Sequence, residues 1–345
     1  MDGLPHSLSP TGAPFPLSGS PSHVTMQRTL RAPISCVGVG LHTGRKLHLA
    51  LLPAPAGHGI VFRRTDLGVD IPARFDHVTD TRLCTMLSLP GNPAARVGTV
   101  EHIMAALAGS GVTNAVIEID GPEVPILDGS AASFLFLIDC AGLATQAAFA
   151  PVIEILRRVA VGQGEATATL HPAPFGLDMD MAIDFAAPAI GRQSLALRLT
   201  PETFRTQLAR ARTFTLAHEI AALRAAGLAL GGSLDNAVVV DEDRVLNPGG
   251  LRMADEFIRH KMLDAVGDLA LSGAALRGRL VTSRAGHALN NQLLRAVFAD
   301  DANWRLLPAA AMRADGLYLS GDGSSNLPSL SSWQERRLPV AAAPY

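Results

Sequence analysis

Apolar and polar residues alternate along this chain with two different periods, one typical of strands and one typical of helices. The two-residue period and short aliphatic runs predict strands at 47–52, 115–119, 152–155, 166–170, 177–185, 237–240 and 280–282. Apolar positions three and four residues apart predict helices near 100–108, 131–140, 201–210, 216–226, 254–271 and 288–299. Strands followed by a helix pair, twice along the chain, indicate an α+β fold made of two units joined near 148–151.

The predicted helix over 254–271 carries three ionisable side chains, His260, Asp264 and Asp268, one turn apart. They fall within one sector of about 80° around the helix. Phe257 and Leu271 lie in the same sector, so this side of the helix is not simply a solvent-exposed face. An imidazole and a carboxylate four residues apart can hold Zn²⁺. A salt-bridge ladder explains the same spacing, and this stretch alone favours the ladder.

A second acid and imidazole pair, Glu101 and His102, falls in the first turn of a predicted short helix that Thr99 caps and Gly109 ends. The pair offers a further metal ligand beside a general base. Alternatively, Glu101 complements the helix dipole and His102 is an ordinary polar residue.

A third histidine, His287, follows a glycine and precedes an apolar helical run. Together with these stretches, seven segments in order resemble the UDP-3-O-acyl-N-acetylglucosamine deacetylase family, the zinc amidases of lipid A synthesis. The resemblance extends from about residue 27 to about residue 310. The segments are GVGLHTG at 38–44, VEHIMAALAG at 100–109, PILDGSAASF at 125–134, ARTF at 211–214, GGSLDNAVVVD at 231–241, EFIRHKMLDAVGDL at 256–269 and GHALNN at 286–291.

The resemblance implies two similarly folded domains, each a sheet with a helix pair, with the helices sandwiched between the sheets and the active site at the domain junction. The domains would span 27–149 and 150–312, with a small insert near 62–86 in the first and a βαβ-type insert near 214–232 in the second. Residues 1–26 and 313–345 are rich in Pro, Ser, Gly or Ala and are predicted to be a disordered extension and a tail, so Met26 is a candidate initiator.

Amide hydrolysis near neutral pH requires an activated water, a stabilised oxyanion and a proton for the departing amine. A catalytic zinc usually has three protein ligands and one open position. The resemblance implies that His102, His260 and Asp264 are those ligands and that one Zn²⁺ is bound per chain. The other implied catalytic residues are Glu101 as the base, His287 as the imidazolium that stabilises the oxyanion and protonates the amine, Asp268 as its orienting carboxylate, and Thr213 as a hydroxyl donor.

The resemblance also implies substrate contacts by Lys261, Phe214, Asp128, Arg284 and His42, the last in a glycine-rich loop beside the pocket. From local sequence alone, Asp128 is equally well a helix cap and Phe214 a core aromatic residue. Arg284 stands where many members have lysine, which keeps the positive charge but changes its geometry. The helical insert at 216–230 would line a narrow passage for an acyl chain, or be a plain amphipathic helix.

The composition of the chain indicates which classes of partner and which cellular compartment to expect. The formal net charge of −2 gives no basic field for nucleic acid, so an anionic sugar nucleotide would be held by local cations. Three cysteines without a CxxC pair indicate a reducing compartment, and no apolar run approaches the ~18 residues of a membrane span. We therefore expect a cytoplasmic monomer that acts on a UDP-linked acylated amino sugar.

Two alternatives remain, a zinc amidohydrolase acting on another N-acetylated sugar and a catalytically silent sugar-nucleotide binder. The presence of both Glu101 and His287 favours an enzyme, because a binding protein has no use for two proton-transfer groups.

Overall fold

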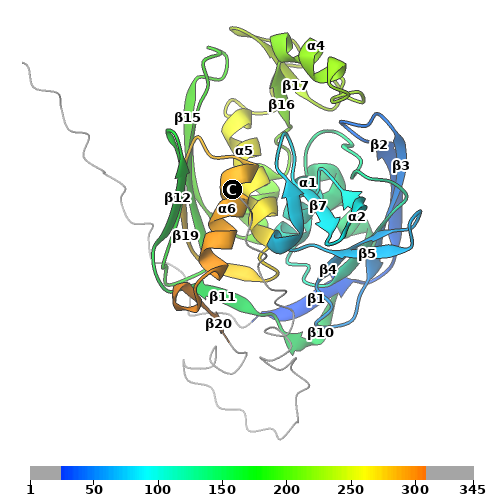
Figure 1. Cartoon of the computed structure of the whole chain (residues 1–345), viewed down its shortest axis with the longest axis vertical. Coiled ribbons are helices and arrows are strands. Elements are labelled where there is room, and N and C mark those ends of the chain that lie inside the picture. The colour runs from blue at the N-terminus through cyan, green and yellow to red at the C-terminus, as the bar shows by residue number, and fades with distance from the viewer. Residues whose placement is uncertain (1–24, 308–345) are drawn as a thin grey trace, which may run out of the picture.

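The computed structural model describes residues 25–307, and Figure 1 shows helices lying between two large sheets. The predicted α+β class is confirmed, since the described residues form six α-helices and several separate sheets. The stretches 1–24 and 313–345, for which disorder is predicted, lie outside the described residues, and Met26 begins the first strand. Within residues 25–307 no helix is long and apolar enough to cross a bilayer.

The first large sheet comes from the first half of the chain and has the strand order β2-β3-β9-β4-β5. In β3 the buried side chains of Leu47, Leu49 and Leu51 alternate with more exposed residues, which is the period of a sheet with one face in the core. The strands are β2 (Ile34–Val39), β3 (Lys46–Pro53), β4 (Ile60–Arg64), β5 (Val69–Pro72) and β9 (Ala115–Ile119).

A small three-stranded sheet stands apart from this large sheet and covers 78–97. The insert expected near 62–86 overlaps it only in part, because β4 pairs in parallel with β9 of the large sheet. Phe62 and Ile71 are completely buried, as core residues are. The small sheet contains β6 (Val78–Asp80), β7 (Met86–Leu89) and β8 (Asn92–Val97), preceded by the 3-10 turn η1 (Phe75–His77).

The second large sheet is organised around β19 (Ala275–Ser283), which pairs with β11, β13 and β14. The strand predicted at 280–282 is only the end of this longer strand. The other members are β11 (Val152–Ile155), β12 (Val159–Gln163), β13 (Ala166–His171), β14 (Leu177–Asp184), β15 (Arg192–Leu199) and β20 (Trp304–Leu307).

A two-stranded sheet of β1 (Met26–Leu30) and β10 (Leu143–Phe149) precedes the point where the chain enters the second large sheet. The separate unit expected near 214–232 begins with β16 (Phe214–Leu216) and α4 (Ala217–Ala225) and continues to β17 (Val238–Asp241), which pairs in parallel with β16. It ends at β18 (Arg244–Val245). The division into two similarly folded domains at 149/150 stays a prediction.

Five of the six predicted helices form within a few residues of their expected ends. The exception is 201–210, where α3 (Pro201–Thr203) runs directly into the π-helical segment η2 (Phe204–Leu208). The others are α1 (Glu101–Ser110), α2 (Ala132–Ala141), α4, α5 (Glu256–Ala270) and α6 (His287–Phe298), and the 3-10 turn η3 (Asp301–Asn303) precedes β20.

The close packing of α1 against α5 positions the residues of the candidate site. A Cβ atom at Gly267 of α5 would lie 2.0 Å from the backbone oxygen of Glu101 in α1. Real Cβ atoms do not approach backbone so closely, so glycine is required here for the two helix backbones to meet. This contact brings the first turn of α1 to the level of Asp264 and Asp268.

Gly267→Ala is therefore expected to lower the free energy of unfolding by about 1–3 kcal/mol, because the new methyl group would push α1 and α5 apart. Helix propensity alone would favour alanine by up to about 1 kcal/mol, so destabilisation would isolate the effect of the contact. Urea unfolding measures it, with Gly249→Ala as the control, since no atom lies within 4 Å of a Cβ at Gly249. Equal stability of the Gly267 variant and the parent would contradict the proposed close contact.

Candidate active site

Three buried side chains, His102 from α1 and His260 and Asp264 from α5, converge where these helices meet. One ligand atom from each residue lies within 4.8 Å of the other two. Asp264 Oδ1 is 3.2 Å from His260 Nε2 and 3.6 Å from His102 Nε2. His260 and Asp264, whose spacing on α5 is predicted, thus meet His102 from the predicted first turn of α1 in one cluster.

The chemistry of these donor atoms fits a bound cation. His260 Nδ1 donates to the carbonyl oxygen of Ala211 at 3.0 Å, which leaves a lone pair on Nε2 when the imidazole is neutral. Burial lowers the pKa of His260 to about 4, so the neutral ring predominates at neutral pH. Asp264 Oδ1 is buried and has no hydrogen-bond donor among residues 25–307. Lone pairs that face one another in a buried place repel unless a cation lies between them.

Next to this cluster, Asp268 holds His287 at the start of α6. His287 Nδ1 lies 2.9 Å from Asp268 Oδ2, and its Nε2 faces Asp264 Oδ2 at 3.9 Å. The side chain of Asn290 donates to the same Asp268 oxygen at 2.8 Å. The structure therefore brings His287 and Asp268 together beside the cluster of His102, His260 and Asp264.

The two groups proposed for proton transfer have pKa values shifted upward for different reasons. Burial by itself would lower the pKa of His287, but the charge and hydrogen bond of Asp268, together with the charge of Glu101, raise it to about 9. Burial raises the pKa of Glu101 above its ordinary value, and the charge of His287 partly opposes this. His287 is thus held as a cation, and Glu101 is a stronger base than an exposed carboxylate.

Lys261 lies at the edge of the cluster. Its ammonium donates to Asp264 Oδ2 at 2.9 Å, and its side chain is 18% exposed. Burial would lower the pKa of Lys261, but the charge and hydrogen bond of Asp264 raise it. The Lys261 ammonium therefore orients the Asp264 carboxylate, while part of the Lys261 side chain reaches the surface.

Thr213 and Phe214 border a pocket of about 300 Å³ that opens beside the cluster. The Phe214 ring lies edge-on to His260 with centroids 6.2 Å apart, and it also contacts Phe257. Phe214 is therefore both a packed aromatic residue and part of a pocket wall. Most other lining residues come from the insert or directly follow it, and they are mainly apolar: Ile220, Leu223, Ala229, Leu234, Val239 and Leu246.

The glycine-rich loop at 38–44 borders the same pocket through Leu41 and His42. Glu123 organises this loop by accepting hydrogen bonds from the backbone amides of His42 and Thr43 and from the hydroxyls of Thr43 and Thr99. Both ring nitrogens of His42 are buried without a partner among the described residues, and burial lowers its pKa. His42 thus presents a neutral imidazole in the pocket wall.

Asp128 connects two loops around the site and does not cap α2. It accepts hydrogen bonds from Ser130 and Ser133 and pairs with Arg252 at 2.9 Å. Arg252 donates its backbone amide to Glu256, which forms a buried ion pair with Arg212. This network adjoins Ala211, whose carbonyl accepts a hydrogen bond from His260, so Asp128 is connected to the site through Arg252 and Glu256.

Arg284 lies outside the cluster of His102, His260 and Asp264 and is partly exposed. It pairs with Glu165 and, at 2.6 Å, with Asp184. A phosphate would have to compete with these carboxylates for the guanidinium. The role of Arg284 in phosphate binding stays a prediction.

Sequence reasoning missed two residues that hold the site together, Glu123 and Thr85. Glu123 follows an Asp-Gly-Pro turn that has ordinary turn composition, and Thr85 stands alone in a loop. Thr85 donates its amide to Glu101 Oε2 at 2.9 Å and its hydroxyl to Asp268 Oδ1 at 2.6 Å. Neither residue belongs to a spaced motif, so only the fold reveals these contacts.

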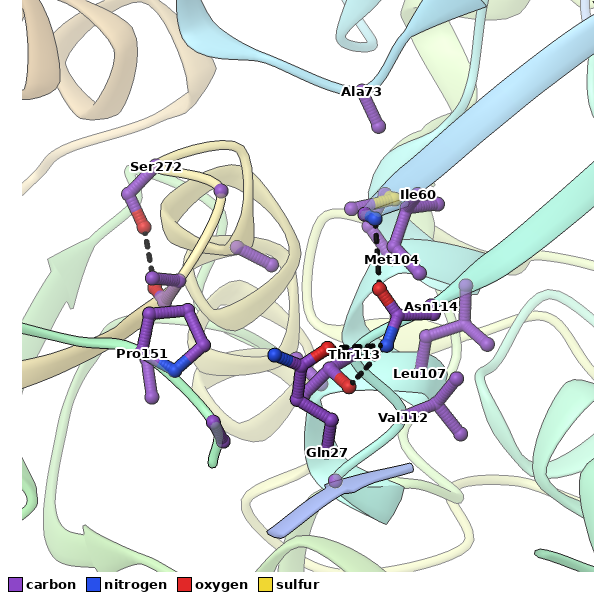
Figure 2. Close-up of a pocket in the computed structure, with 18 of the residues that line it drawn as sticks. Gln27, Ile60, Ala73, Met104, Leu107, Val112, Thr113, Asn114, Pro151 and Ser272 are labelled. Atoms are coloured by element: carbon purple, nitrogen blue, oxygen red, sulfur yellow. Dashed lines mark hydrogen bonds between the residues drawn. The ribbon is translucent and has the colours of Figure 1, made fainter. Parts of the chain in front are cut away.

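A second cavity, larger than the pocket beside Phe214, lies away from this cluster. Figure 2 shows Met104 and Leu107 on one side of it and Pro151 and Ser272 on the other. Its volume is about 590 Å³, and its lining includes none of the predicted site residues. The smaller pocket beside Phe214 is therefore the one next to the reactive groups.

Comparison with known proteins gives consistent matches. The family model for UDP-3-O-acyl N-acetylglycosamine deacetylase matches residues 27–299, a range that contains every residue of the candidate site. The chain is 50% identical over 285 residues to the UDP-3-O-acyl-N-acetylglucosamine deacetylase of Idiomarina loihiensis, covering 81% of this chain and 92% of that protein. It is 48% identical over 299 residues to the enzyme of that name from Myxococcus xanthus, covering 86% and 94%.

Proposed function

The chain belongs to the UDP-3-O-acyl N-acetylglycosamine deacetylase family, and from this membership we propose how its site removes an acetyl group. The reaction is hydrolysis of the acetamide of a UDP-3-O-acyl-N-acetylglucosamine to the free amine and acetate, a step of lipid A synthesis. The observation that carries the proposal is the convergence of three buried ligand atoms beside a paired imidazole and a buried carboxylate.

We assign Zn²⁺ to the cluster of His102, His260 and Asp264. Two imidazoles and one carboxylate form one of the usual protein donor sets of a catalytic zinc. The orphaned Asp264 Oδ1 and the lone pair on His260 Nε2 support this assignment. When bound there, zinc supplies a Lewis acid that polarises an amide carbonyl and lowers the pKa of water towards neutrality.

Two residues around the cluster each carry out one of the proton transfers. Glu101 takes a proton from the attacking water, because its carboxylate is buried next to a ligand and its pKa is raised. His287, charged through its contact with Asp268, stabilises the developing oxyanion and donates a proton to the leaving nitrogen. The Thr213 hydroxyl adds a hydrogen bond to the oxyanion from the pocket wall.

The neighbouring pocket suits the acyl chain. Its lining is mainly aliphatic, and the insert 214–245 supplies most of it. An acyl chain that leaves water gains about 0.8 kcal/mol for each buried CH₂ group. We assign Phe214 and His42 to the wall near the sugar, Lys261 and Arg284 to the sugar nucleotide, and Asp128 to support of the surrounding loops.

Acetate release from the UDP-linked acylated sugar, measured beside free N-acetylglucosamine, tests the function. We expect turnover of the first substrate and none of the second, because only the first fills the apolar pocket. Faster reaction of the free sugar would favour the alternative of a general sugar amidohydrolase. Absence of acetate from both would favour a silent binder.

The pH dependence of kcat/KM is expected to be bell-shaped. Activity should fall at low pH as Glu101 becomes protonated, and at high pH as His287 loses its proton. A zinc ion nearby disfavours the imidazolium, so the basic limb should lie at or below the value of about 9. His287→Ala should flatten the basic limb. A basic limb that persists in this variant would assign it to another group, although close groups titrate together.

We place the protein in the cytoplasm as a monomer. The three cysteines, Cys36, Cys84 and Cys140, are all free, which fits a reducing compartment. Size-exclusion chromatography with light scattering would test the oligomeric state.

A further inference from the structure

The loop that joins β6 to β7 in the small sheet touches both the apolar pocket and the proton-transfer groups. Leu83 lines the pocket beside Phe214, and its side chain is 51% exposed. Its φ of 65° is in the left-handed region, which a branched aliphatic residue rarely adopts. The loop therefore holds an apolar side chain at the pocket against the local preference of its backbone.

Two residues further on, Thr85 is only 1% exposed and uses all its polar groups. Its amide donates to Glu101 Oε2 and its hydroxyl to Asp268 Oδ1, at 2.9 and 2.6 Å. Its carbonyl accepts from the amide of Val100 at 3.3 Å. A single residue thus contacts the carboxylate assigned as the base and the carboxylate that orients His287.

We propose that Thr85 is a positioning residue that aligns Glu101 and the Asp268–His287 pair, and that Leu83 links this alignment to an acyl chain in the pocket. The proposal rests on the proposed deacetylase function. A chain that covers Leu83 would favour the conformation of 83–85 seen here, because it removes an exposed apolar side chain from water. Part of the acyl-chain binding energy would then appear as faster turnover and not only as tighter binding.

The geometry of Asp268 explains why the Thr85 hydroxyl matters. One oxygen of Asp268 accepts from His287 and Asn290, and Thr85 is the donor to the other oxygen. A carboxylate whose two oxygens are both bound cannot rotate freely, so His287 keeps its direction towards Asp264. Without the hydroxyl, one buried carboxylate oxygen would lose its donor.

The first test compares Thr85→Val, which keeps the shape but removes the hydroxyl, with Thr85→Ser, which keeps the hydroxyl. For Thr85→Val we expect kcat on the long-chain substrate to fall about 10- to 100-fold, with KM changed less than threefold and zinc content unchanged. Thr85→Ser should recover most of kcat. Thr79→Val removes a hydroxyl from the same small sheet, where Thr79 bonds to Ser88, and serves as the matched control.

The second test varies the acyl chain. With the parent protein, kcat should be higher for a substrate with a long 3-O-acyl chain than for one with a 3-O-acetyl group. Leu83→Ala should reduce this ratio of kcat values at least threefold, and Thr85→Val should also reduce it. These ratios compare two substrates in one preparation, so a partly folded variant does not obscure them.

Three outcomes would overturn the proposal while leaving the deacetylase function intact. They are a Thr85→Val enzyme with kcat within twofold of the parent, an equal loss in Thr85→Ser and Thr85→Val, and an unchanged kcat ratio in Leu83→Ala. Failure of the parent itself to release acetate would instead refute the proposed function.

Discussion

Replacing Glu101 with glutamine is expected to lower turnover by about 10²–10⁴, which corresponds to about 3–5 kcal/mol of barrier, while the metal stays bound. Glutamine keeps the shape and a polar group but cannot accept a proton from water. Glu101 is 3% exposed and accepts a hydrogen bond from the amide of Thr85, so the replacement also keeps a hydrogen-bond acceptor there. The expected effect is therefore on chemistry and not on folding.

Single-turnover kinetics and metal content measured on the same preparation check this result. Glu118→Gln provides the matched control, since Glu118 is a partly exposed residue of β9 that faces Arg63. His287→Ala should lose turnover to a similar extent, through the oxyanion and the leaving group. Near-normal turnover in Glu101→Gln would mean that another acceptor takes the proton.

Alanine at any one of His102, His260 and Asp264 is expected to remove both metal and activity. Each residue supplies one of three converging ligand atoms, so its loss leaves two. Affinity should fall by more than the about 10–100-fold that follows loss of an outer partner of a ligand. Activity should fall with metal occupancy.

Asp268→Ala is the matched comparison on the same helix. Asp268 contacts His287 and Thr85 and is not one of the converging ligands, so this variant should keep zinc and lose turnover. Equilibrium dialysis against zinc, with metal measured by mass spectrometry, distinguishes the two kinds of variant. Full zinc binding in all three ligand variants would refute the assigned site.

The sequence predicts helices better than strands in this protein, for a physical reason. Helix α5 shows its period over fifteen residues, whereas β5, β6 and β7 have only three or four residues each. So few positions cannot establish a two-residue period. Burial of Phe62 depends on the pairing of β4 with β9, about fifty residues further along the chain, and no local pattern reports such pairing.

The residues of the candidate site also differ in whether a local sequence pattern indicates them. His260, Asp264 and Asp268 share one helix, so their spacing predicts a common face, and the resemblance adds His102 and His287. Thr85 and Glu123 lie in loops, and each makes several hydrogen bonds to residues distant in the sequence. Their importance comes from the hydrogen bonds that the folded chain gives them, and the residue types alone do not indicate it.

The close contact at Gly267 has a consequence for the order of folding. Of the three residues assigned to zinc, His102 belongs to α1 and the other two belong to α5, so the complete cluster forms only when these helices have packed. Contacts between distant segments tend to form slowly, after local helices. Zinc should therefore be captured tightly only late in folding, and by binding the native state it would then stabilise the packed helices. The rate at which a refolding chain acquires tight zinc binding would report when α1 and α5 come together.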